Sequence, residues 1–116
     1  MRRQALITMI DAASSAGTSD VVANTNCDLL SVQVSGTLTA VSVKVQGKTN
    51  PEADDWTDLA VFDKTSMELT AGSTGITAKG IYEANIAGVV LVRVSVTSVT
   101  GGNVTVVGSF ENTSEN

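Results

Sequence analysis

The sequence predicts an all-β protein: a two-sheet antiparallel sandwich of the jelly-roll type with about eight strands. Short runs of β-branched residues alternate with small polar residues, and segments rich in glycine, serine and threonine separate these runs. No stretch repeats apolar residues with a period near 3.6 over three turns, as an amphipathic helix would. Charged residues make up only 16% of the chain, so the composition lacks the Glu and Lys content typical of helical proteins.

The N-terminal third begins with one clear strand. Residues Gln4 to Ile10 are mostly apolar, and we expect them to form the first strand. Residues Asp11 to Ser19 are small and polar and predict a loop across the surface. Val21 and Val22 then predict a short edge strand.

Two regular runs follow. Apolar residues occupy every second position from Leu30 to Val34 and again from Val41 to Val45, with polar residues between them. This period of two is typical of half-buried strands. Because Gly36 and Thr37 form a turn signal between the runs, we expect an antiparallel pair whose apolar faces share one core.

The second half predicts five strands and a tail. A polar loop from Gly47 to Asp55 leads to a strand from Trp56 to Phe62 and a weaker one from Ser66 to Thr70. Further strands are expected at 80–85, 89–96 and 104–110, with a glycine turn at 101–102 before the last one. Residues 111–116 are polar and predict a frayed tail.

Length and charge limit the function classes. The 116 residues fit one domain, spanning 1–116, and the formal net charge is −5. The seven basic residues are scattered apart from Arg2 and Arg3, so the sequence lacks the basic stripe of a nucleic-acid-binding protein. Arg2 and Arg3 predict a flexible charged N-terminal arm, with a contact arm as the alternative.

Cellular location follows from two further features. Cys27 is the sole cysteine, which excludes an internal disulfide and predicts a buried, apolar role. The apolar run after Arg3 is too short for a signal-peptide core or a membrane span. We therefore expect assembly in a cytoplasm, unless another route exports the chain, and no membrane partner.

The residue types in the sequence argue against an enzyme. The sequence contains no histidine, which removes the commonest general base and the commonest transition-metal ligand. Carboxylates cluster between Glu52 and Asp63, where a carboxylate-only enzyme or a calcium site is conceivable. The spacing matches no calcium-loop template, so a solvated acidic loop is the preferred interpretation, and no enzyme activity, metal or cofactor is expected.

Three residues are candidates for structural or contact roles. Trp56 is predicted to anchor the core or its rim through an indole N–H that reaches a backbone oxygen, with a glycan platform as the alternative, and Tyr82 is a second anchor. By parity, Val90, Val92, Val94 and Val96 face one way. Leu91 and Arg93 then face the other way. For Arg93 we favour a cross-strand ion pair with Glu83 or Asp58, with a subunit contact as the alternative.

An ordered set of short motifs resembles small β-rich virion proteins of tailed bacteriophages and prophages. The set runs from Leu30 to Phe110 and comprises the segments 34–37, 41–47, 55–59, 80–82, 87–88, 92–94 and 101–106. In that group a V-S-G-T-like strand end, a tryptophan loop, a G-x-Y strand start and a V-R-V strand recur in this order. The loop here, Asn50 to Asp55, lacks the glycine that usually follows the aspartate.

The resemblance implies a structural component of the virion. We expect a capsid decoration or cement protein that contacts the major capsid protein and other virion proteins. The alternative is a tail or fibre accessory, or a module that recognises a host-surface protein or glycan. Proteins of this group are commonly trimeric, so the resemblance also implies a homo-oligomer. Candidate subunit contacts are Leu91, Arg93, Val107, Arg2 and Arg3, because apolar or arginine side chains on an outward face often mark interfaces.

Overall fold

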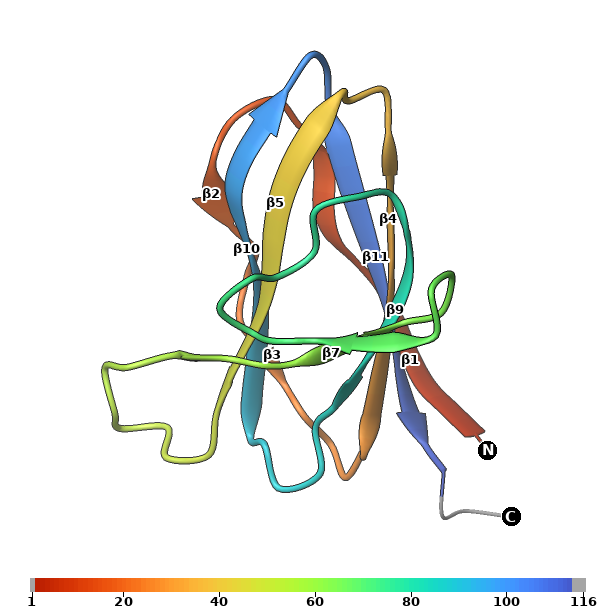
Figure 1. The fold of residues 1–116 in the computed structure, drawn as a ribbon. Coiled ribbons are helices and arrows are strands. Elements are labelled where there is room, and N and C mark those ends of the chain that lie inside the picture. The colour runs from red at the N-terminus through yellow and green to blue at the C-terminus, as the bar shows by residue number, and fades with distance from the viewer. Residues whose placement is uncertain (1, 114–116) are drawn as a thin grey trace.

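The computed structural model describes residues 2–113 and contains two antiparallel sheets that pack face to face (Figure 1). The six-stranded sheet has the order β1 (Arg2–Ala13), β11 (Val104–Asn112), β4 (Leu29–Gly36), β9 (Gly80–Asn85), β7 (Val61–Asp63) and β8 (Glu68–Thr70). The five-stranded sheet has the order β2 (Gly17–Thr18), β10 (Leu91–Thr100), β5 (Ala40–Lys48) and β6 (Thr57–Asp58), and β3 (Val22–Ala23) also pairs with β10. The all-β sandwich is confirmed, with eleven strands in the described residues because several strands are only two or three residues long.

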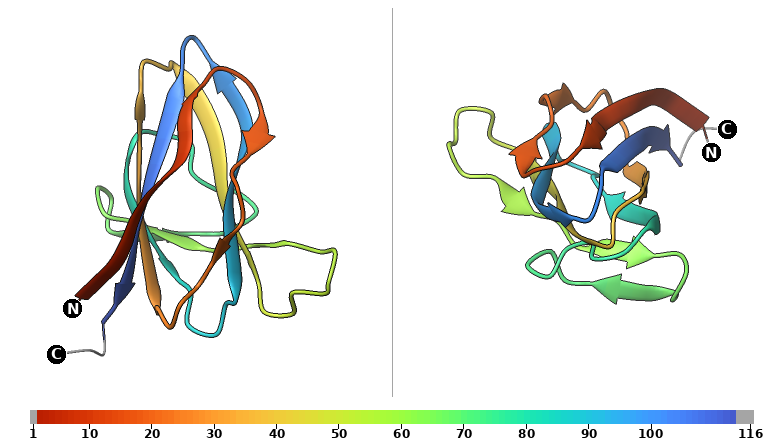
Figure 2. Two further views of the ribbon diagram at one scale, coloured as in Figure 1. Left: turned by 180° about the vertical axis from the view of Figure 1, so that it is seen from behind. Right: turned by 90° about the horizontal axis from the view of Figure 1, so that it is seen from above.

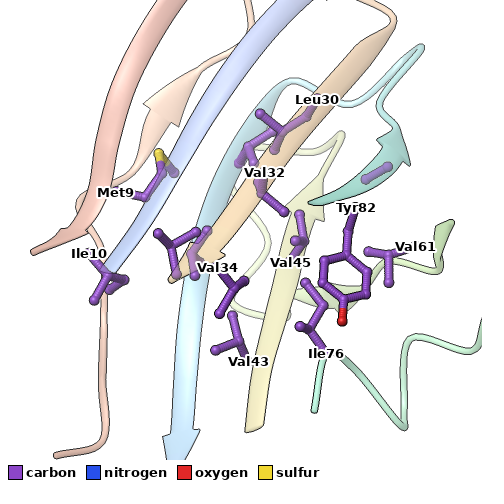
Figure 3. Close-up of a cluster of buried hydrophobic side chains, with 14 of the residues drawn as sticks. Met9, Ile10, Leu30, Val32, Val34, Val43, Val45, Val61, Ile76 and Tyr82 are labelled. Carbon is purple, nitrogen blue, oxygen red and sulfur yellow. The ribbon is translucent and has the colours of Figure 1, made fainter. Parts of the chain in front are cut away.

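The core lies between the inner faces of the two sheets. Apolar side chains at every second position of β4, β5, β10 and β11 are almost fully buried, as the period of two predicts. Figure 3 shows Val32 and Val34 of β4 beside Val43 and Val45 of β5, with Met9 and Ile10 at one side and Tyr82 and Val61 at the other. Burial of this apolar surface is the main stabilising contribution to the fold.

The predicted pair of strands around Gly36 is wrong in one respect. β4 pairs with β11 and β9, whereas β5 pairs with β10 and β6 in the other sheet. The two runs therefore face each other across the core instead of lying side by side. Their alternation shows which face of each strand is buried, but it is the same for a hairpin neighbour and for a strand in the opposite sheet.

The glycine turn at 101–102 joins consecutive strands, as predicted, but it also crosses between the sheets. β10 ends at Thr100 in the five-stranded sheet, and β11 begins at Val104 in the six-stranded sheet. Gly101 and Gly102 both have positive φ angles, 80° and 153°, which β-branched residues rarely adopt. The reversal of direction at this end of the sandwich therefore depends on glycine.

The segment from Trp56 to Phe62, predicted as one strand, is two. Thr57 and Asp58 form β6 beside β5, while Val61 to Asp63 form β7 beside β9 in the other sheet. The chain crosses the open side of the sandwich between them, and the backbone N–H of Leu59 donates to Val45 O over 2.8 Å. The apolar residues of this segment therefore belong to both sheets, which their run in the sequence does not reveal.

Within residues 2–113, the first and last strands are longer than the sequence predicts. β1 begins at Arg2, in place of a flexible arm, and its backbone pairs with the last strand, Arg2 with Asn112 and Arg3 with Glu111. The predicted tail accordingly contributes its first two residues to β11, and the side chain of Asn112 is buried. Each terminal strand supplies the backbone partners of the other, a pairing between distant segments that local polarity does not indicate. Residues 114–116 of the predicted tail lie outside the described residues, as do the side chains of Arg2 and Arg3.

Candidate functional site

The outer face of the five-stranded sheet carries a group of cations, which we call the basic face: Lys44 and Lys48 of β5 and Arg93 of β10. Their neighbours Val45 and Val94 point into the core, so the alternation of the strands places these three side chains outward. Trp56, from the loop before β6, packs against two of them. The ring centroid lies 4.3 Å from the guanidinium carbon of Arg93 and 4.7 Å from Lys48 Nζ.

Two hydrogen bonds and one ion pair hold the side chains of the basic face in place. Arg93 Nε donates to Gln46 Oε1 over 2.8 Å, and Gln46 Nε2 donates to Asp58 Oδ1 over 2.8 Å. Lys44 Nζ lies 3.4 Å from Asp58 Oδ2. The hydrogen bond from Gln46, followed by the one from Lys44, lowers the pKa of Asp58 below its ordinary value, so this carboxylate stays ionised in mildly acidic solution.

The predicted ion pair of Arg93 is therefore wrong for both partners. Gln46 stands between Arg93 and Asp58, and the charge of Asp58 faces Lys44 instead. Glu83 lies in the other sheet, where its carboxylate is 3.4 Å from Lys64 Nζ. The prediction failed because the strand pattern fixes neither sheet membership nor strand order: Glu83 lies in the other sheet, and β5 separates Arg93 on β10 from Asp58 on β6.

The two predicted aromatic anchors occupy different places in the sandwich. Tyr82 lies in the core: it is 4% exposed, and its hydroxyl donates to Ala78 O over 2.8 Å. Burial, with a smaller contribution from Asp63, raises its pKa above the ordinary value. Trp56 is half-buried at the rim of the five-stranded sheet and outside the core, and it packs on cations in place of the predicted indole bond to a backbone oxygen.

The outer face of the six-stranded sheet carries an apolar patch: Leu6 of β1, Ile81 of β9 and Val107 of β11. Leu6 is 60% exposed, Ile81 is 45% exposed and Val107 is half-buried. Together with polar residues of β4 and β11 they line a shallow hollow. Val107 pairs with Gln33, and Gln33 pairs with Ile81, so Val107 and Ile81 lie in one row across three strands, while Leu6 lies in the next row on this face, where it pairs with Ser109.

The structure separates the predicted contact residues into two groups. Leu91 is half-buried at the start of β10, where it pairs with Lys48, and it shares the outer face with Arg93. Val107 lies on the opposite side of the sandwich. Val90, predicted to point inward, precedes β10 and is exposed. Leu6 and Ile81 were not predicted as members of the apolar patch. The alternation of their strands could have placed both side chains on the outer face.

The acidic segment from Glu52 to Asp63 spreads over several environments. Glu52, Asp54 and Asp55 are exposed on the loop between β5 and β6. Asp58 belongs to the basic face, and Asp63 Oδ1 accepts a hydrogen bond from the backbone N–H of Thr65 over 2.8 Å. Within residues 2–113, no three acidic or cysteine side chains gather closely enough to hold a metal ion. The geometry therefore lends no support to a calcium site here.

Comparison with known proteins decides the family. The family model described as XepA matches residues 3–110, which is nearly the whole chain. The chain belongs to the XepA family. A search of curated proteins found no match. In the described part of this XepA-family chain, no helix has the length and apolar character needed to cross a membrane.

Two solved structures share the fold of this XepA-family sandwich. The SPBc2 prophage-derived protein YomS superposes with a TM-score of 0.79 at 28% identity, over 91% of this chain and 90% of YomS. The PBSX exported protein XepA superposes with a TM-score of 0.79 at 20% identity, over 93% of this chain. The chain spans only 38% of the length of that XepA structure. The resemblance to phage and prophage proteins is thus confirmed at the level of family and fold.

Proposed function

We propose that this XepA-family chain is a non-enzymatic structural protein of a phage particle, where it decorates or cements the capsid through contacts with the major capsid protein and with other copies of itself. The observation that carries the proposal is the apolar patch of Leu6, Ile81 and Val107 on an outer sheet face. The solvated face of an antiparallel sheet is ordinarily polar, and apolar side chains grouped on it mark surfaces that become buried in a complex.

The chemistry of the side chains supports binding over catalysis. The sequence has no histidine, and the carboxylates between Glu52 and Asp63 are either exposed or engaged in structural hydrogen bonds. On the outer face of the six-stranded sheet Ser109 Oγ donates to Glu111 Oε2 over 3.1 Å, but this pair has no histidine to act as general base. A protein with these surfaces is suited to holding other proteins together.

The extent of the structural matches supports a modular role. The same sandwich accounts for 90% of YomS but for 38% of XepA, so it occurs both as nearly a whole protein and as part of a longer one. A unit used in both ways is suited to assembly with copies of itself or with other domains. A fold alone does not define a function, so the two outer faces of the sandwich carry the proposal.

The decisive experiment is to measure the copy number of this protein in purified particles by quantitative mass spectrometry. Hundreds of copies in each particle, located on the capsid by electron microscopy, are the expected result. A dozen copies or fewer would contradict decoration and favour a tail or fibre location. Complete absence from purified particles would contradict a structural role.

The name of one relative favours a second candidate function. The PBSX protein is described as exported, and an exported sandwich acts outside the cell that produces it. We propose as the alternative a module that binds a host-surface protein or glycan through one of its outer faces. Recovery of the protein from the medium, separate from particles and bound to cells, would support this alternative over decoration.

A further inference from the structure

The basic face concentrates positive charge in an acidic chain. Lys44, Lys48 and Arg93 are three of only seven basic residues, while the chain as a whole has a net charge of −5. The single carboxylate among them, Asp58, is engaged by Gln46 and Lys44. The face therefore keeps an excess of positive charge, which attracts a negatively charged group from outside.

The guanidinium of Arg93 is positioned to bind a negatively charged group. Its guanidinium is held by the hydrogen bond from Nε to Gln46 and by the ring of Trp56. Its two terminal amino groups make no hydrogen bond to any residue in the part of the chain that the structure describes. A guanidinium fixed in this way presents two parallel donors to a carboxylate and loses little side-chain freedom on binding.

The matching negative surface lies on the same chain, in what we call the acidic loop, residues 49–56 between β5 and β6. This loop extends well beyond the two sheets (Figures 1 and 2). Glu52, Asp54 and Asp55 on it are exposed, and within residues 2–113 none of the three is in an ion pair. The loop is held in shape where Lys48 Nζ donates to Ala53 O over 2.6 Å.

We infer that the acidic loop of one copy binds the basic face of a neighbouring copy, with a loop carboxylate paired to the terminal amino groups of Arg93. This inference deepens the proposed function and rests on the self-association proposed there. The loop is attached to its own basic face through Trp56 and Lys48, while its three carboxylates are exposed, so a second copy is the partner whose charge they fit. Loop and face are different surfaces, so the contact is heterologous and its repetition closes a ring or extends a filament.

The test is sedimentation velocity on the full-length chain and two charge-reversal variants. The loop variant carries Glu52→Lys, Asp54→Lys and Asp55→Lys, and the face variant carries Lys44→Glu and Arg93→Glu. The wild-type protein is expected to be oligomeric, each variant alone monomeric, and an equimolar mixture of the two is expected to associate again with the variants in alternating order, because the loop of each variant is then complementary to the face of the other. In about 1 M NaCl, where the screening length falls to about 3 Å, the wild-type oligomer is expected to dissociate.

A matched control separates this contact from a general effect of charge. The variant Asp11→Lys, Asp20→Lys and Glu68→Lys makes the same change in net charge as the loop variant, but at exposed carboxylates outside the acidic loop. It is expected to remain oligomeric. Circular dichroism verifies that each variant is folded. An oligomer that survives both reversals would overturn the inference, while the particle copy number would still decide the proposed function.

Two other results would also overturn the inference. A wild-type chain that is monomeric at every concentration has no such contact. A monomer that binds inorganic phosphate in a titration, and loses this binding on Arg93→Glu, would assign the basic face to an external anion instead of a second copy.

Discussion

Arg93 stacks on Trp56, with its guanidinium carbon 4.3 Å from the centroid of the ring, and this contact joins β10 to the loop before β6. Cation–π contacts at partly exposed sites contribute about 0.5 to 1 kcal/mol. A double-mutant cycle of Trp56→Leu and Arg93→Met should therefore give a coupling free energy in this range, measured by urea denaturation. Trp56→Leu combined with Lys79→Met, which removes a lysine bonded to the Gly36 carbonyl, should be additive. Equal coupling in both cycles would contradict a specific role for the stack.

Gly36 ends β4 at a point where a side chain cannot fit. Its φ angle is 134°, and a Cβ built there would lie 2.1 Å from the carbonyl oxygen of Asn103. Gly36→Ala should lower the free energy of unfolding by more than about 2 kcal/mol, because backbone strain and overlap add. Gly17→Ala is the matched control, since a Cβ at Gly17 meets nothing within 4 Å, and it should change stability by less than about 0.5 kcal/mol. Equal effects of the two substitutions in urea denaturation would contradict this account.

Sequence patterns predicted the faces of the strands better than their partners. The alternation from Leu30 to Val34 and from Val41 to Val45 gave the buried residues correctly, because burial on one face imposes a period of two. The same pattern could not place the two runs in different sheets, since partner choice depends on where short loops cross. The contact residues show the same limit. Parity placed Val107 on an outer face, but the hydrogen-bond partner of Arg93 is Gln46 on the neighbouring strand, which only the register reveals.

Deprotonation of Tyr82 should make the stability of the fold depend on pH in alkaline solution. Its native pKa is raised by burial, so the unfolded chain loses this proton at a lower pH than the folded protein does. The contribution to stability is fully present below the unfolded pKa of about 10 and is lost as the pH rises through the higher native value. Tyr82→Phe should remove this alkaline loss while costing about 1 kcal/mol at neutral pH, since the bond to Ala78 O disappears.

The measurement for Tyr82 is the midpoint of urea unfolding between pH 8 and about pH 11. Wild-type stability should fall over the upper part of this range, and the fall should be smaller in Tyr82→Phe. Because the chain has one tyrosine, absorbance of the phenolate reports the same titration directly. Parallel pH curves for the two proteins would show that other groups cause the alkaline loss.

The apolar patch should matter for incorporation into particles and not for folding. Leu6 is 60% exposed and Ile81 is 45% exposed, so Leu6→Ser with Ile81→Thr removes little buried surface from the isolated chain. If a partner covers both side chains, each lost methylene group weakens the contact by about 0.8 kcal/mol, and 1.4 kcal/mol corresponds to a factor of about ten in affinity. Occupancy in particles that carry the double variant should therefore fall by at least about tenfold, as measured by quantitative mass spectrometry.

Met67 supplies the control for that experiment. Its side chain is 68% exposed, but it lies just before β8, outside the apolar patch, so Met67→Ser removes a similar exposed apolar group from another surface. Occupancy should remain at the wild-type level in this variant, and both variants should melt within a few degrees of the wild-type protein. Loss of occupancy with Met67→Ser and none with the patch variant would move the capsid contact to the β7–β8 hairpin. That result would refute the patch as the carrier of the proposed function, because the exposed apolar residues that bind would then belong to the edge of the sheet and not to its face.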